Sequence, residues 1–324
     1  MLAFDATLIA FDQNNNHVAY ATSQNFWVEV WTADLTKNMK RLLMRLPYEA
    51  TSEYSLSLSK NGTYLCVAQK NKKTLLAVSK IDTGENIDSE GLGFVDNFWW
   101  DAWRDDVLFT QKDGTTIKHA LSDSTQRKVG YDPKHAGTFD SSKDVFLEES
   151  NNRIALSFFD GTVSSIITYL PLGNYELRDS PHGLILLFDT ARSRLVLIDA
   201  NSRDQPILLS EEAVTAVWDV TDTLLAFSNG YDLKIYNPSN HEIKTVTRLS
   251  ERITNIGWHS LPGILMYQVG GNTFAIDAIG MRATTQTLLV KDVSGAFWET
   301  QDGKSLYIVD EKNGGDVLRR PLRE

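Results

Sequence analysis

Hydrophobic and polar residues alternate along this chain in short runs that recur at a nearly constant interval. Each interval opens on a bulky apolar residue and a polar turn, and continues through an apolar run, a tight turn and further alternating residues. The stretch AVWDVTDTLLAFSNGYDLKIYN (Ala216–Asn237) shows this order. Alternation with a period of two predicts half-buried β-strands, and Asn-Gly or Gly-Gly turns supply the positive φ of tight hairpins. The pattern therefore predicts an all-β protein.

The opening residues of successive intervals lie 38 to 47 residues apart. They are Phe11, Leu58, Trp100, Phe139, Leu177, Trp218, Trp258 and Trp298. Counting from the last of these through the C-terminus and on from Met1 to the first gives 37 residues, so one more interval closes a circle. Four short strands in about 40 residues are typical of a β-propeller blade. We predict a single propeller domain over residues 1–324 with eight four-stranded blades, or seven if the long first interval is misassigned.

The chain ends are predicted to close the ring. A four-stranded sheet cannot bury its faces alone, whereas sheets stacked around an axis bury both. The last interval has only three strand-like runs, GAFWET, SLYIVD and DVLRRPL. The N-terminal run MLAFDA is expected to supply the missing outer strand and so join the first blade to the last.

Two stretches carry a family resemblance: WHSLPGILMY, which begins at Trp258, and LSKNGTYLCV, which begins at Leu58. Their order of bulky residue, polar turn with Gly and apolar strand resembles the TolB-type propellers, which are WD-repeat-like. No interval has the Gly-His and Trp-Asp pair of a true WD repeat. The resemblance implies a module of a larger cell-envelope or surface protein and an extracytoplasmic location, with a cytoplasmic one left open. An anchor or flanking domain would lie outside this chain.

The eight opening residues are interpreted as contacts between adjacent blades. A tryptophan buries roughly 200 Å² in such a contact. The next position in each interval is occupied by Asp12, Ser59, Asp101, Asp140, Arg178, Asp219, His259 and Glu299. The favoured interpretation of this column is turn formation, because Asp and Ser side chains accept hydrogen bonds from nearby backbone N–H groups. The alternative is a ring of carboxylates that holds a cation.

Composition excludes several classes of function. The net charge of −10 argues against binding to nucleic acid. No apolar run reaches the ~20 residues of a membrane-spanning helix. The one cysteine, Cys66, lies in an apolar run and is expected to be a buried, inert thiol.

No catalytic motif stands out in the sequence. There is no G-x-S-x-G, H-E-x-x-H, P-loop or G-x-G-x-x-G motif, and the six histidines are not paired at metal-binding spacing. We therefore predict neither catalytic residues nor metals nor cofactors. A hydrolase or lyase with its site in the central channel stays as the alternative, and a purely structural spacer is a third.

The favoured function is a non-catalytic module that binds a protein or peptide. The longest predicted loops, RLPYEATSEY, NIDSEGLGFVDNF and GYDPKHAG, are rich in aromatic residues. Exposed aromatic side chains on loops are common anchors for protein partners. The predicted binding residues are Tyr48, Phe94, Trp99, Trp103, Tyr131 and His135. The alternative is that these loops only cover a hydrophobic edge of the scaffold.

Overall fold

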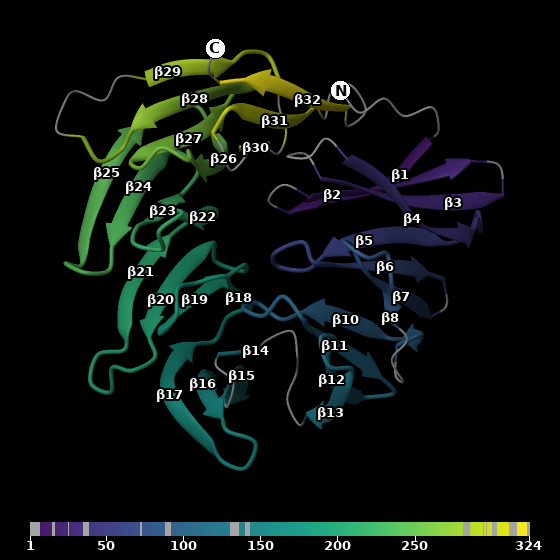
Figure 1. Ribbon diagram of the computed structural model, residues 1–324. Helices are drawn as coiled ribbons and strands as arrows, with labels where there is room; N and C mark the ends of the chain where they lie inside the picture. The colour runs from purple at the N-terminus through teal and green to yellow at the C-terminus, as the bar shows by residue number, and fades with distance from the viewer. Residues whose placement is uncertain are drawn as a thin grey trace. The chain divides into compact units, whose positions relative to one another are not determined.

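In the residues that it describes, the computed structural model has only β-structure as regular secondary structure (Figure 1). It describes residues 7–14, 17–24, 26–34, 39–71, 73–87, 92–129, 136–139, 143–280, 286–293, 295, 297–299, 303–310 and 316–322. The chain divides into two compact units, Phe4–Leu172 and Gly173–Glu324, called here the N-terminal and C-terminal units. Each unit is described by itself.

The N-terminal unit contains sheets A, B, D and E among its described residues. Sheet A consists of β1 (Thr7–Asn14), β2 (His17–Gln24), β3 (Trp27–Asp34) and β4 (Met39–Pro47). Sheet B consists of β5 (Glu53–Leu58), β6 (Tyr64–Lys70), β7 (Thr74–Lys80), β8 (Asn86–Ile87) and β9 (Phe94–Val95). Sheet D consists of β10 (Asn97–Trp100), β11 (Val107–Lys112), β12 (Thr115–Ala120) and β13 (Thr125–Val129). Sheet E consists of β14 (Ala136–Thr138), β15 (Asp144–Ser150), β16 (Arg153–Phe159) and β17 (Ser164–Pro171).

The described part of the C-terminal unit contains sheets F, G, H and I. Sheet F consists of β18 (Tyr175–Arg178), β19 (Leu184–Asp189), β20 (Arg194–Asp199) and β21 (Ile207–Glu212). Sheet G consists of β22 (Thr215–Trp218), β23 (Leu225–Ser228), β24 (Asp232–Asn237) and β25 (Glu242–Arg248). Sheet H consists of β26 (Ile253–Trp258), β27 (Ile264–Val269), β28 (Asn272–Asp277) and β29 (Gln286–Val290). Sheet I has the three strands β30 (Phe297–Glu299), β31 (Ser305–Asp310) and β32 (Asp316–Pro321).

Every described sheet is an antiparallel meander whose strands follow sequence order, as the repeat predicts, except that β9 of sheet B pairs with β7. The first strand of each sheet is called its inner strand and the last its outer strand. In such a meander the hairpin between the second and third strands lies at the same end as the connection that enters the inner strand. This end is called the hairpin end, and the other is the opposite end.

Most outer strands share a β-bulge that the repeat pattern did not predict. Between consecutive ladder pairs, one apolar residue of the outer strand is left unpaired. These residues are Leu43, Ile167, Leu208, Val246 and Leu289. Four of them are half-buried and Val246 is fully buried. A bulge increases strand twist and interrupts the open edge, which discourages pairing with other chains.

The hydrophobic core lies between consecutive sheets within each unit. One cluster joins sheet G to sheet H through Leu233, Ile253 and Tyr267, and others join A to B, B to D, F to G and H to I. Cys66 is fully buried in the cluster between sheets B and D, and burial raises the pKa of its thiol. This confirms an inert core cysteine. Burial of both faces of a sheet by its neighbours is the arrangement that stacked repeats require.

The four-stranded antiparallel sheets and the three-stranded last sheet confirm the predicted architecture of the repeat. The run MLAFDA, expected to complete the last sheet, lies outside the described residues. Ring closure, the number of blades and the single domain 1–324 therefore stay predictions.

Candidate partner-binding surface

Four strongly exposed aromatic side chains lie at the hairpin end of sheets A and B in the N-terminal unit. The exposed fractions are 83% for Phe26, 50% for Trp27, 41% for Tyr48 and 57% for Phe94. These four residues are called the aromatic surface. Folding alone does not favour such exposure, because transfer of apolar area out of water is favourable. Contiguous exposed apolar side chains commonly mark an interaction site.

Hydrogen bonds and ring stacking hold the sheet A part of this surface in place. The backbone N–H of Tyr48 donates to the carbonyl of Phe26 at 2.8 Å, and Trp27 is paired with Pro47 across β3 and β4. The ring of Tyr48 stacks on Tyr54, with centroids 6.4 Å apart and an angle of 15°. The hydroxyl of Tyr54 donates to the carbonyl of Pro47 at 3.0 Å. The loop between sheets A and B is therefore ordered by its own contacts.

The sheet B part of the surface is an added strand. The predicted loop NIDSEGLGFVDNF forms two short strands, β8 and β9, that both pair with β7. Phe94 lies opposite Leu75, and the N–H of Leu76 donates to the carbonyl of Gly93 at 2.9 Å. The side chain of Phe94 is exposed although its backbone belongs to the sheet, so it is held on a rigid element.

Two lysines flank this aromatic residue. Lys70 and Lys73 are exposed at the β6–β7 hairpin, and the next residue, Thr74, pairs with Val95 beside Phe94. Neither lysine forms an ion pair with any residue that the structure describes. By contrast, Arg45 of sheet A pairs with Glu29 at 2.9 Å. The hairpin end of sheet B thus carries two exposed lysines without an ion pair, with Glu53 opposite Lys70 in the β5–β6 ladder, on a chain whose net charge is −10.

The structure separates the predicted binding residues. Tyr48 and Phe94 lie in the aromatic surface, whereas Trp99 is half-buried in β10. Trp103 lies in the β10–β11 connection, at the opposite end of sheet D. Its ring is nearly perpendicular to that of Phe139, with the two ring centroids 5.9 Å apart. Trp103 is therefore not at the end that carries Tyr48 and Phe94. Tyr131 and His135 lie outside the described residues.

Sequence reasoning missed Phe26 and Trp27, the most exposed pair on this surface. Both belong to the stretch SQNFWVEVW, in which the alternation continues without a break into β3. The available signal was the turn itself, since Asn25 is followed directly by two adjacent aromatic residues. A bulky apolar pair at a turn points to exposure rather than burial.

Two tryptophans of the repeated column fasten adjacent sheets by the same hydrogen bond. The indole N–H of Trp258 donates to the carbonyl of Val217 at 3.1 Å, and that of Trp100 donates to the carbonyl of Ser57 at 3.2 Å. Each acceptor lies on the inner strand of the preceding sheet. Val217 comes directly before Trp218, and Ser57 comes directly before Leu58. The equivalent Trp218 packs between sheets F and G, but its buried indole N–H has no partner among the described residues.

The rest of the column also lies in the scaffold where its side chains are described. Leu58 is buried between sheets A and B, Leu177 is half-buried, and Phe139 packs on Phe158 with ring centroids 5.1 Å apart. The side chains of Phe11 and Trp298 lie outside the described part of the structure.

The acidic column serves turns and, in addition, contacts between sheets. Asp219 accepts from the backbone N–H groups of Thr223 at 2.6 Å and Leu224 at 2.8 Å, which is turn chemistry. Asp12 instead accepts from the N–H of Leu58 in the next sheet at 2.6 Å. Glu299 accepts from the N–H of Ser260 in the preceding sheet at 2.8 Å. These carboxylates act as clamps between sheets.

A network of charged groups, most of them buried, joins sheet D to sheet E. Lys118 lies 2.7 Å from the carboxylate of Asp144, which also pairs with Arg127. Thr138 accepts from Lys118 and donates to Asp101 at 2.6 Å. Burial raises the pKa of Asp101, while hydrogen bonds from Thr138 and the following turn oppose this shift. The two cations and two carboxylates balance, so the network is a structural fastening.

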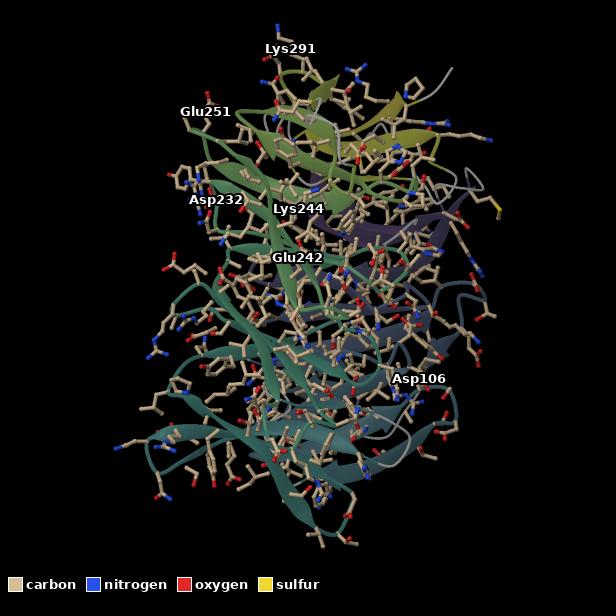
Figure 2. The ribbon with its side chains drawn as sticks, turned by 90° about the vertical axis from the view of Figure 1, so that its left-hand side faces the viewer. Asp106, Asp232, Glu242, Lys244, Glu251 and Lys291 are labelled. Carbon is tan, nitrogen blue, oxygen red and sulfur yellow. The ribbon has the colours of Figure 1, made fainter. Side chains whose placement is uncertain are left out.

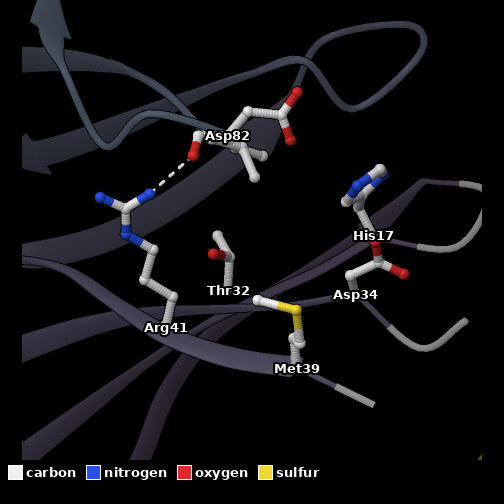
Figure 3. A pocket seen from close by; sticks show the side chains of 7 residues that line it. His17, Thr32, Asp34, Met39, Arg41 and Asp82 are labelled. Carbon is white, nitrogen blue, oxygen red and sulfur yellow. Dashed lines mark hydrogen bonds between the residues drawn. The ribbon is translucent and has the colours of Figure 1, made fainter. Parts of the chain in front are cut away.

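The cavity between sheets A and B is small. It has a volume of about 170 Å³ and is lined by His17, Asp34, Arg41 and Asp82 together with apolar side chains (Figure 3). The guanidinium of Arg41 donates to the backbone carbonyl of Asp82 at 2.7 Å, so part of its bonding capacity is already used. Ligand sites usually occupy about 300–1,000 Å³. This cavity is therefore too small for an organic substrate of ordinary size.

The hairpin end of the C-terminal unit is dominated by charged residues. Arg248, the last residue of β25, pairs with Asp232 at 2.6 Å. Figure 2 shows Asp232 and Glu251 on the same side of this unit, away from Glu242 at the start of β25. One large aromatic side chain, Tyr231, is strongly exposed there, at 51%. The concentration of exposed aromatic residues is thus a property of the N-terminal unit.

Within the described residues, no three His, Cys, Asp or Glu side chains come together as metal ligands. The same part of the chain contains no helix long and apolar enough to cross a bilayer.

Solved structures with similar folds are numerous. The chain aligns with a structure of the Dos1 propeller at 14% identity and a TM-score of 0.60, covering 98% of this chain and 92% of that one. It aligns with Sqt1 of Saccharomyces cerevisiae at 11% identity and a TM-score of 0.58, covering 98% and 97%. It also aligns with a eukaryotic initiation factor at 12% identity and a TM-score of 0.66, covering 98% and 86%.

These similarities, together with the repeated sheets, establish a WD-repeat-like β-propeller fold for this chain. At such low identity they show the fold alone. No protein-family profile and no curated protein sequence matches the chain.

Proposed function

We propose that this chain is a non-catalytic binding module that captures a protein or peptide segment on its aromatic surface. The observation that carries the proposal is the exposure of Phe26, Trp27, Tyr48 and Phe94 at one end of sheets A and B. Trp and Tyr residues are enriched among the residues that dominate binding energy in protein interfaces.

The scaffold favours binding over catalysis at this surface. The aromatic side chains are held by paired strands and by the Tyr48–Tyr54 stack, so little conformational entropy is lost when a partner docks. The buried charged groups Asp101 and Lys118 lie between sheets instead. A rigid apolar surface without a catalytic group is suited to recognition.

The charge beside the surface indicates the chemistry of the partner. Lys70 and Lys73 lie at the β6–β7 hairpin, at the same end of sheet B as Phe94, and have no ion pair within the described structure. Opposite charges across an interface raise the association rate and select partners. The proposed partner is a segment with apolar or aromatic anchors followed by acidic residues. As a module of a larger envelope or surface protein, the propeller would hold such a segment outside the cytoplasm.

The test is selection of ligands from a displayed library of random peptides, followed by affinity measurement with the whole chain. We expect selected peptides to contain aromatic or aliphatic anchors near Asp or Glu. The double variant F26A/W27A should weaken their binding at least about tenfold, because each anchor contributes about 1 kcal/mol or more.

The matched control is Met39→Ala, which removes a 61% exposed side chain at the opposite end of sheet A. It should leave affinity unchanged. The charge-reversal variant K70E/K73E should weaken acidic ligands selectively, and added salt should do the same for the unaltered chain. The proposal is rejected if selected ligands bind F26A/W27A as tightly as the unaltered protein, or if Met39→Ala weakens them equally.

A further inference from the structure

The longest described outer strand without a charged side chain lies in the N-terminal unit. β17 (Ser164–Pro171) is the outer strand of sheet E, and its sequence, SSIITYLP, contains no Lys, Arg, Asp or Glu. The charge-free stretch extends from Gly161 to Tyr175. An outer strand presents unpaired backbone N–H and C=O groups, and charged side chains usually prevent another chain from pairing with it.

The chain provides its own comparison. Lys40, Arg41 and Arg45 lie on β4, Arg127 and Lys128 on β13, and Glu242, Lys244 and Arg248 on β25. β4 and β25 carry both charged residues and a bulge, and β13 carries charged residues alone. β17 has only the bulge at Ile167. Sheet E therefore lacks the charge protection of sheets A, D and G. β29 (Gln286–Val290) of sheet H also lacks charge, but it has five residues against eight in β17.

The side chains around this edge are apolar and exposed. The exposed fractions are 64% for Val163, 54% for Ile166, 47% for Tyr169 and 38% for Leu172. β-branched and aromatic residues pair favourably across neighbouring antiparallel strands. Ile166 and Tyr169 are thus suited to contact a further strand added to sheet E.

We infer that β17 is a self-association edge, at which a second copy of this chain adds its own β17 in antiparallel orientation. Two copies each carry a net charge of −10 and repel one another over most of their surfaces. The charge-free strand is where the two chains meet with least repulsion. An antiparallel pair of identical strands is also self-complementary. When one residue of the first copy contacts another residue of the second copy, the same contact occurs with the two copies exchanged.

Self-pairing at another outer strand illustrates the difference. Two copies of β4 paired about Leu43 would set Arg41 opposite Arg45, so like charges would face one another. Two copies of β17 paired about Ile166 would set Ser164 opposite Thr168 and Val163 opposite Tyr169. No full-length register of β17 with itself opposes two charges.

The predicted dimer is weak. A pair of edge strands buries much less than the roughly 1,200–2,000 Å² of a stable interface, so association should require high protein concentration. Its salt dependence is distinctive. Because salt screens the repulsion between two acidic chains, added salt should strengthen the dimer, whereas it should weaken capture of an acidic peptide by Lys70 and Lys73.

The test is sedimentation velocity of the whole chain over a wide concentration range. The unaltered protein should shift from monomer to dimer, and Ile166→Lys should stay monomeric at the same concentrations. Tyr169→Lys provides a second variant if the first folds poorly, as judged by circular dichroism. The matched control is Ile243→Lys on β25, where the side chain is 41% exposed, and it should dimerise normally.

Several results would overturn the inference. These are a chain that is monomeric throughout, lysine variants that dimerise like the unaltered protein, open-ended assembly beyond the dimer, or dissociation of the dimer by added salt. A synthetic peptide of residues 163–172 should compete with dimerisation. Peptide binding without any dimer would instead assign the edge to another protein.

Discussion

At the scale of single residues, the tryptophan column is a set of hydrogen-bond donors as well as apolar contacts. Trp258 and Trp100 each reach the carbonyl of a residue in the preceding sheet, at 3.1 and 3.2 Å. Trp218 occupies the same place in its repeat without such a partner. The repeat therefore offers an internal comparison of a satisfied and an unsatisfied buried N–H.

Replacing tryptophan by phenylalanine separates the two cases. Trp258→Phe removes a made hydrogen bond, and we expect it to lower the free energy of unfolding by about 1–3 kcal/mol beyond the loss of packing. Trp218→Phe removes a buried donor that has no partner, so it should cost less. Urea unfolding of both variants checks this order, and an equal or reversed order would contradict it.

A buried histidine gives a prediction about pH. Nε2 of His119 lies 2.8 Å from Oγ1 of Thr110, and burial lowers the pKa of this histidine from 6.5 to about 4. The folded state binds the proton less tightly than the unfolded state does. Stability supplied by the neutral ring is therefore complete above pH 6.5 and is lost as the pH falls toward 4.

The variant His119→Gln isolates this effect. Between pH 7 and pH 5 the unaltered chain should lose about 2 kcal/mol more stability than the variant does. The difference between the two proteins removes the contribution of carboxylates that titrate in the same range. Parallel pH dependences in chemical unfolding would show that His119 titrates normally.

At the scale of the element, sheets are joined by polar clamps as well as by apolar cores. The network of Lys118, Asp144, Arg127 and Thr138 crosses from sheet D to sheet E. Its members are far apart in the sequence, and only the pairing of strands brings them together. Loss of one partner from a buried ion pair leaves an uncompensated charge.

We expect Asp144→Asn to destabilise the chain by about 3–5 kcal/mol, because Lys118 would stay buried without its carboxylate. The control is Glu176→Gln, which breaks the exposed Arg178–Glu176 pair and should cost at most about 1 kcal/mol. Denaturant titration compares the two. Similar small losses would indicate that water reaches Lys118 freely.

The sequence predicted the elements well because their pattern is local and repeated. The alternation of VAYAT or LLAFS fixes which face of a strand is buried, and the turns fix where each strand ends. The bulges at residues such as Val246 were not predictable, because a one-residue shift of the alternation inside a strand of five to nine residues leaves too few residues to reveal it. The sequence predicts a loop around Phe94, because a strand of two paired residues leaves no periodic signal.

The candidate surface was predicted only in part. Tyr48 and Phe94 were found because they lie in long connections, but Phe26 and Trp27 continue the alternation of β3. Trp103 was grouped with them although it follows the inner strand of its sheet and so lies at the opposite end. Which end of a sheet a residue occupies depends on strand order, and neighbouring positions in the sequence do not reveal it.

At the scale of the whole molecule, the repeated sheets and the similarity to solved propellers establish the fold. The expected ring depends on the N-terminal run MLAFDA, which is predicted to add a fourth strand outside β32. Such closure would stabilise both chain ends, because neither could detach without opening the ring. It would also make the two units parts of one domain.

A disulfide between the chain ends tests this prediction most directly. Cysteines placed at Leu2, Ala3 or Phe4 and at Leu318 or Arg319 cover both faces of two neighbouring strands, whose Cα atoms would lie about 5 Å apart. Buried Cys66 should stay reduced. If the ring is closed, mild oxidation of the folded chain should form an intramolecular disulfide in at least one pair and raise the thermal midpoint. If no pair forms a disulfide, the N-terminal strand lies elsewhere and the ring is not closed in this way.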